Sequence, residues 1–161
     1  MTAFDPLGSL RVLSDHAVRF VVIGGIAGAT HGSPSVTQDL DVCYERGPEN
    51  LEHLSVALGS IHAELRGADE GVPFSIDAKT LAAGDHFTFA TDLGDLDCLG
   101  IPAGTLGYDD LMESAIDVDL DGLVVAVASI DDLIRMKRAA GRPRDLAELE
   151  ILGALRDEPH P

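Results

Sequence analysis

Two pairs of aspartates have a spacing that places carboxylates together on one face of a β-strand. One residue separates Asp39 from Asp41, and one residue separates Asp95 from Asp97. Residues two apart in a strand point to the same side, so each pair presents two carboxylates in one direction. Converging carboxylates repel one another, and hard divalent cations neutralise such clusters at neutral pH. The sequence therefore predicts a site for Mg²⁺, with Mn²⁺ as the alternative ion.

A glycine pair and a lysine extend this set toward a nucleoside triphosphate (NTP). Gly24-Gly25 follows the β-branched run RFVVI and precedes a small-residue segment, which predicts a strand, a tight turn and a helix. Such a turn lets the backbone approach a phosphate closely. Lys137 falls inside the apolar arc of a predicted helix and needs an anionic partner there, unless its amine extends past the apolar neighbours to water. With paired metal ions, this set is suited to in-line phosphoryl displacement on an NTP.

The elements that must hold these residues alternate between helix and strand. We expect a helix from Asp5-Pro6 to about His16, strands at 19–23 and 40–44, and a helix at 48–61. The segment from Arg66 to Val72 is a polar, glycine-containing loop in which we expect no chemistry. Further along, we expect hairpins at 86–99 and 116–127, a short helix at 108–115, and two helices at 130–140 and 143–156 split by Gly141-Arg142-Pro143. This order predicts an α/β (α+β) fold, with a small mixed sheet, flanking helices and a C-terminal helical hairpin.

Length and charge limit the classes of protein to consider. The 161 residues fit a single domain, with a core at about 17–128 and the helical hairpin at about 129–157. The formal net charge of −17 argues against a preformed nucleic-acid groove, because such a surface repels polyanions. Cys43 and Cys98 lie in apolar runs without metal or redox spacing, which predicts buried thiols in a reducing cytoplasm. No stretch has the roughly 20 apolar residues that a membrane helix needs, and the start has no basic signal region. We therefore expect a cytoplasmic protein without a membrane partner.

The segment GGIAGATHGSPSVTQDLDV, from Gly24 to Val42, resembles the glycine-pair and Asp-x-Asp signature of the DNA polymerase β-type nucleotidyltransferases. Within that superfamily, the match is closest to the small nucleotidyltransferases of toxin–antitoxin and abortive-infection systems. Three later stretches extend the resemblance: the third-carboxylate strand around Asp97, the lysine helix from Ile130 to Lys137, and the closing motif GRPRDL from Gly141.

The resemblance implies roles for single residues. Asp39, Asp41 and Asp97 would be catalytic metal ligands, with Asp97 the third carboxylate in preference to Asp95, which stays a spare candidate. Lys137 would be a catalytic contact to the triphosphate. The nucleotide-binding set would be Gly24, Gly25, Thr37, Lys137 and Asp145. The family often has a basic residue just before Thr37, whereas this chain has Ser35, which bears on phosphate affinity and acceptor choice.

The implied reaction is transfer of a nucleoside monophosphate from an NTP to an acceptor. In the toxin branch the acceptor is the 3′ end of tRNA, and a cognate antitoxin restrains the enzyme. The charge of −17 leaves open a cationic small acceptor such as an aminoglycoside, or a protein hydroxyl. A catalytically weak NTP-binding interaction module is the third alternative. Arg142 and Arg144 either contact an acceptor or balance nearby acids.

Overall fold

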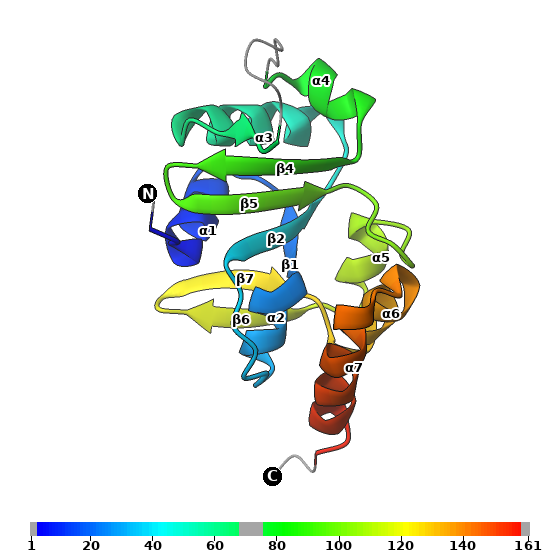
Figure 1. The fold of residues 1–161 in the computed structure, drawn as a ribbon. Helices are drawn as coiled ribbons and strands as arrows, with labels where there is room; N and C mark the ends of the chain where they lie inside the picture. The colour runs from blue at the N-terminus through cyan, green and yellow to red at the C-terminus, as the bar shows by residue number, and fades with distance from the viewer. Residues whose placement is uncertain (1–2, 68–75, 159–161) are drawn as a thin grey trace.

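The computed structural model describes residues 3–67 and 76–158, in which the strands form one mixed sheet. The strand order is β3-β4-β5-β2-β1-β7-β6 (Figure 1). β2 runs parallel to β5 and β1 runs parallel to β7, while the other neighbours are antiparallel. The strands are β1 (Phe20–Ile23), β2 (Asp39–Tyr44), β3 (Glu64–Leu65), β4 (His86–Thr91), β5 (Gly94–Leu99), β6 (Ile116–Leu120) and β7 (Leu123–Val127). The mixed α/β architecture expected from the sequence is confirmed.

Helices cover both faces of this sheet. They are α1 (Pro6–Asp15), α2 (Gly24–Thr30), α3 (Pro48–Ser60), α4 (Ala78–Ala83), α5 (Tyr108–Met112), α6 (Ile130–Ala140) and α7 (Pro143–Arg156). α2 packs against β1 and β2 in front of the sheet in Figure 1, and α1 and α3 pack together behind it. α6 and α7 form an antiparallel pair beside α2. The region between α2, α6 and the front of the sheet is where the predicted site residues lie.

Alternation along the central strands separates a buried face from a polar one. In β2, Leu40 and Val42 are fully buried, whereas Asp39 and Asp41 are partly exposed. The same alternation in β5 buries Leu96 and leaves Asp97 partly exposed on the opposite face. The apolar side chains behind the sheet therefore form the core, and the carboxylates lie on the front.

Most predicted elements occur where the sequence indicates them. The Asp5 side chain accepts from the Gly8 N–H at 2.8 Å and caps α1, and the Ser129 hydroxyl caps α6 in the same way. Two elements were missed: β3 is only two residues long, and α4 has one buried side chain, Leu81, so neither carries a clear period. The helix expected at 108–115 ends at Met112. Residues 68–72 of the expected loop lie outside the described residues.

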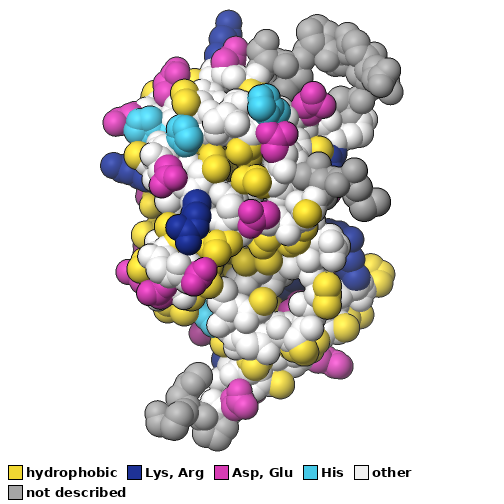
Figure 2. All heavy atoms as spheres, turned by 90° about the vertical axis from the view of Figure 1, so that its left-hand side faces the viewer, with side chains coloured by type: hydrophobic (Ala, Val, Ile, Leu, Met, Phe, Trp, Pro, Cys, Tyr) yellow, Lys and Arg dark blue, Asp and Glu magenta, His cyan; other side chains and the backbone are white. Residues whose placement is uncertain are grey.

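Cysteine and surface expectations can also be compared with the structure. Cys43 and Cys98 are free and buried, and burial raises the pKa of the Cys43 thiol to about 12. No helix in the described ranges is long and apolar enough to cross a membrane. Acidic side chains are spread over the face drawn in Figure 2 rather than gathered in one patch.

Candidate active site

The carboxylates of β2 and β5 meet because the two strands pair in parallel and in register. Asp39 lies opposite Asp95, and Asp41 lies opposite Asp97. One oxygen from each of Asp39, Asp41 and Asp97 lies within 4.8 Å of the other two. Asp97 has 14% of its side chain exposed and Asp95 has 44%, so the more buried member of the second pair joins the cluster. We call Asp39, Asp41 and Asp97 the carboxylate triad.

The triad concentrates negative charge where water is scarce. Burial first, and then the charges of Asp39 and Asp97, raise the pKa of Asp41 from 3.8 to about 7. Burial also raises the pKa of Asp97, although the nearby Arg66 guanidinium opposes this rise. Two unit charges about 5 Å apart repel by roughly 3 kcal/mol at an effective dielectric constant near 20. Three oxygen donors under this repulsion are the ligand type that Mg²⁺ and Mn²⁺ prefer, so the residues present fit a divalent cation.

Short contacts set the orientation of the first carboxylate pair. The Thr37 hydroxyl donates to Asp39 Oδ1 at 3.0 Å and lies 3.1 Å from the Asp39 carbonyl oxygen. A Cβ at Gly25 would meet Thr37 Cβ at 2.9 Å. Thr37 therefore orients Asp39, and Gly25 leaves the space that Thr37 occupies.

Gly24 is required for a related reason. It adopts φ +68°, a backbone conformation that residues other than glycine rarely adopt. A Cβ there would meet Asp41 Oδ2 at 2.0 Å. The chain passes directly from β1 into α2 at this residue, without the separate turn that the sequence suggested. The glycine pair thus brings the backbone against Asp41 and Thr37.

The opposite side of the site is formed by α6 and α7. Asp145 is fully buried and accepts hydrogen bonds from Lys137 Nζ at 3.2 Å and from Arg142 Nε at 2.9 Å. The side chain of Arg142 first, and then its backbone N–H and the Lys137 amine, hold the pKa of Asp145 down at about 2. Asp145 is therefore the anionic partner that the sequence required for Lys137. The turn Gly141-Arg142-Pro143 brings the two together, because it folds α7 back against α6.

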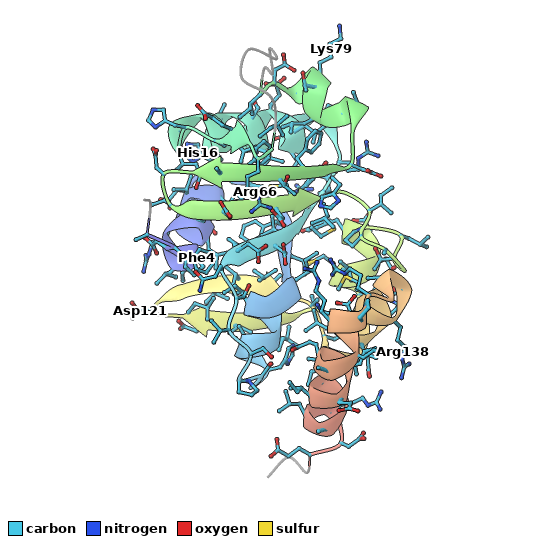
Figure 3. All side chains as sticks on the ribbon, viewed as in Figure 1. Phe4, His16, Arg66, Lys79, Asp121 and Arg138 are labelled. Atoms are coloured by element: carbon cyan, nitrogen blue, oxygen red, sulfur yellow. The ribbon has the colours of Figure 1, made fainter. Side chains whose placement is uncertain are left out.

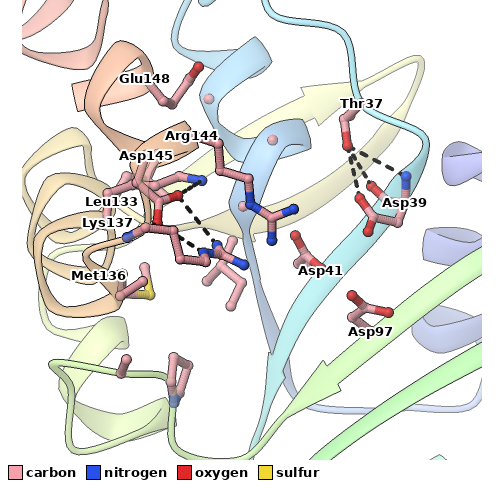
Figure 4. A pocket seen from close by; sticks show the side chains of 18 of the residues that line it. Thr37, Asp39, Asp41, Asp97, Leu133, Met136, Lys137, Arg144, Asp145 and Glu148 are labelled. Carbon is pink, nitrogen blue, oxygen red and sulfur yellow. Dashed lines mark hydrogen bonds and ion pairs between the residues drawn. The ribbon is translucent and has the colours of Figure 1, made fainter. Parts of the chain in front are cut away.

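A cavity of about 450 Å³ lies between the triad and these cations. Its lining includes every residue that the sequence assigned to the site: Gly24, Gly25, Thr37, Asp39, Asp41, Asp97, Lys137 and Asp145. Figure 4 shows the triad on one side of the cavity and the Lys137–Asp145 pair on the other. The volume lies within the range of small-molecule sites, and apolar residues such as Leu133 and Met136 contribute to its wall.

Comparisons with known proteins were made on sequence and on structure. No protein-family model and no curated protein matches the chain. The lincosamide antibiotic adenylyltransferase LnuA, solved with lincomycin bound, superposes over 92% of this chain and 94% of its own with a TM-score of 0.62 and 11% identity. The antibiotic-resistance factor ANT(2″)-Ia superposes over 93% of this chain and 81% of its own, with a TM-score of 0.58 and 12% identity. The chain has the nucleotidyltransferase fold.

A third similar structure agrees with this assignment. It is a Thermotoga maritima protein proposed to be a nucleotidyltransferase, matched over 96% of this chain and 94% of its own with a TM-score of 0.56 and 16% identity. These likenesses extend over nearly the whole chain. The expected closeness to toxin–antitoxin members stays a prediction.

The structure adds two arginines to the site: Arg66, which was given no role from the sequence, and Arg144, which was expected either to contact an acceptor or to balance nearby acids. No chemistry was expected in the loop that begins at Arg66, but its guanidinium contacts Asp97 Oδ1 at 2.5 Å and Asp95 Oδ2 at 2.9 Å. The two-residue strand before it has no period that could reveal this long-range contact. Arg144 lines the cavity, and its side chain extends into it in Figure 4.

This chain has Ser35 where the family often has a basic residue before Thr37, and Arg144 brings a positive charge to the same cavity. Ser35 Oγ donates to Glu148 Oε2 at 2.6 Å, so the position that is often basic is here tied to α7. Arg144 makes no ion pair with any residue of the ranges 3–67 and 76–158, whereas Lys137 and Arg142 both contact Asp145. The cavity thus has a cation without an acidic partner among the described residues, supplied by α7.

Proposed function

We propose that the protein transfers a nucleoside monophosphate from an NTP to a hydroxyl group of an acceptor and releases pyrophosphate. The observation that carries this proposal is the carboxylate triad facing Arg144 and Lys137 across one cavity. A triphosphate needs cations along its phosphates. The carboxylates beside its reacting phosphorus must in turn be neutralised by a bound divalent cation. The nucleotidyltransferase fold, which includes adenylyltransferases among its members, supports this assignment.

The triad has two tasks in the proposed reaction, to hold a divalent cation and to accept a proton. Asp39 and Asp41, with Asp97 as the third ligand, would hold a divalent cation, Mg²⁺ or Mn²⁺, and Thr37 would orient Asp39. When bound, the cation supplies Lewis-acid stabilisation of phosphate oxygens. Asp97 accepts the proton of the acceptor hydroxyl, because its burial and the negative charge of Asp39 raise its pKa and so favour the protonated form.

The bonds that form and break follow from these positions. The acceptor oxygen forms a bond to the α-phosphorus as its proton passes to Asp97. The bond from the α-phosphorus to the bridging oxygen breaks, and pyrophosphate leaves with that electron pair. Arg144 and Lys137 stabilise the charge that develops on the leaving group. Asp145 holds Lys137 in place, since it binds the amine at 3.2 Å from a fully buried position.

The net charge of the protein favours one class of acceptor over another. A net charge of −17 attracts a cationic small molecule and repels tRNA, the acceptor implied by the toxin resemblance. One structure of ANT(2″)-Ia, itself similar to this chain, contains adenylyl-2″-tobramycin. We therefore place a cationic small acceptor first and tRNA, with its antitoxin partner, second.

The test is a transfer assay with each α-labelled NTP in the presence of Mg²⁺. Total tRNA, an aminoglycoside and a lincosamide serve as acceptors, each at two salt concentrations. Label should move to the small acceptor in the wild type and should be lost in Asp41→Ala, while Asp117→Ala, an exposed aspartate on edge strand β6, keeps activity. Transfer to tRNA alone would instead support the toxin alternative. Mg²⁺-dependent NTP binding without transfer to any acceptor would favour a binding module and contradict the proposal.

A further inference from the structure

Arg66 lies in one row with the triad across the sheet. Its backbone N–H donates to the Thr88 carbonyl at 2.9 Å, which continues the pairing of β3 with β4. Thr88 lies opposite Asp97, and Asp97 lies opposite Asp41. Because paired residues of neighbouring strands point to the same face, the row places the Arg66 side chain on the front of the sheet. Figure 3 shows Arg66 there, in front of β5.

The guanidinium of Arg66 bridges two carboxylates of β5. It is 2.5 Å from Asp97 Oδ1 through Nη2 and 2.9 Å from Asp95 Oδ2 through Nη1. Only 29% of the Arg66 side chain is exposed; burial alone would lower its pKa, but the negative charges of Asp97, Asp95 and Asp39 together raise it. No other cation forms an ion pair with the triad among the described residues. Arg66 reaches the triad from the β4 side of β5, whereas Lys137 lies across the cavity from the triad in Figure 4.

We propose that Arg66 is a positioning residue for Asp97. This inference rests on the proposed function. A carboxylate turns freely about its Cβ–Cγ bond unless one oxygen is fixed. Arg66 fixes Oδ1, and it is itself fixed by the backbone bond to Thr88 and by the second carboxylate, Asp95. The remaining oxygen of Asp97 is then directed at Asp39 and Asp41, where it completes the cation site and meets the acceptor proton.

A planar guanidinium is needed for this role, since it contacts both carboxylates at once. A lysine ammonium at the same position keeps the charge but cannot span Asp95 and Asp97 with fixed geometry. Partners that orient metal ligands in this way commonly change metal affinity or activity by about 10- to 100-fold when removed. Charge alone acts in the opposite direction, because loss of a nearby cation strengthens the attraction for a divalent ion. Removal of Arg66 should therefore weaken divalent-ion binding if Arg66 positions Asp97, and should strengthen it if Arg66 acts by charge alone.

The first experiment is a Mn²⁺ titration that requires no turnover. Free Mn²⁺ is followed by electron paramagnetic resonance in wild type, Arg66→Gln, Arg66→Lys, Asp97→Asn and the Arg66→Gln/Asp97→Asn double variant. We expect both single Arg66 variants to bind Mn²⁺ about tenfold more weakly than wild type. In the Asp97→Asn background, Arg66→Gln should change the affinity less than twofold. Thermal unfolding checks that every variant is folded.

Three results would overturn the role of Arg66. These are tighter Mn²⁺ binding in Arg66→Gln, wild-type affinity in Arg66→Lys, and an effect of Arg66→Gln that persists without the Asp97 carboxylate. A wild type that binds no Mn²⁺ would contradict the cation site of the proposed function itself. The three results above would contradict only the role of Arg66, so the two failures are distinguishable. Transfer kinetics give the second readout: Arg66→Gln should lower kcat at least tenfold and change the KM for NTP less than threefold, because the triphosphate lies against the other wall.

Discussion

Replacing Asp41 by asparagine should remove activity and yet stabilise the ion-free protein. The pKa of Asp41 is raised from 3.8 to about 7, so its charged form is disfavoured in the folded state. A group with a raised pKa contributes stability that is fully present below pH 3.8 and is lost as the pH rises through about 7. Above pH 7 the ion-free wild type therefore folds against the charge of Asp41, and the neutral amide of the same size does not.

The magnitude follows from the difference between the two pKa values. The change from 3.8 to about 7 corresponds to roughly 4 kcal/mol. Partial exposure and coupling with Asp97 reduce this, so we expect a gain of about 2–4 kcal/mol in the free energy of unfolding at pH 8. For a chain of this size, the midpoint of thermal unfolding should rise by roughly 5–15 °C. At pH 4 the wild-type carboxyl is protonated and the difference should shrink toward zero.

The assay is thermal unfolding with a chelator at pH 4, 6 and 8. The same series is then repeated with Mg²⁺ at about 10 mM, a concentration chosen to saturate the site. Mg²⁺ should stabilise wild type and leave Asp41→Asn unchanged, because the variant lacks a ligand. Asp117→Asn on edge strand β6 is the matched control and should show neither effect. An Asp41→Asn protein that is less stable than wild type at pH 8 in chelator, or a gain that does not depend on pH, would refute the reasoning.

Three further predictions concern the walls of the site. Gly24→Ala should lower both stability and activity, since its Cβ meets a carboxylate oxygen at 2.0 Å, whereas Gly59→Ala on α3 has open space and should be neutral or stabilising by about 0.5 kcal/mol; chemical unfolding compares them. Arg144→Gln should raise the KM for NTP about tenfold with an unchanged unfolding midpoint, and Arg138→Gln, exposed on the same hairpin, should not. Asp145→Ala should cost about 1–3 kcal/mol, because it removes the buried hydrogen-bond partner of two partly exposed cations. The pKa of Asp145, lowered to about 2, gives wild type a stability that is present above pH 3.8 and lost as the pH falls toward 2, so the deficit of the variant should narrow in acid unfolding curves.

The parts of the site that depend on local alternation could be predicted from the sequence. Asp39 and Asp41 share a face because they are two apart in a strand, whatever that strand pairs with. The choice of Asp97 over Asp95 came from resemblance alone. Its physical reason, deeper burial, depends on the parallel register of β2 with β5, which no local pattern encodes.

The parts that depend on contacts between distant segments could not be predicted. Arg66 follows a strand too short to show a period, and its role requires the pairing of β3 with β4. Lys137 was expected to have an anionic partner, but its identity as Asp145 follows from the way the helical hairpin closes. Ser35 is explained by α7 in the same way, since Glu148 of this helix binds it and the first turn of the same helix supplies Arg144 to the cavity.

The parallel pairing of β2 with β5 joins two faces whose energetics oppose each other. On the front, Asp41 is held against Asp97, a pair that would separate if the strands were free. Behind it, in the same register, Leu40 pairs with Leu96 and both side chains are fully buried. The force that assembles the charged face is therefore applied from the apolar face of the same two strands. A substitution that creates a cavity behind β2 would first loosen the cation site in front of the strand, at a loss of stability too small to unfold the protein.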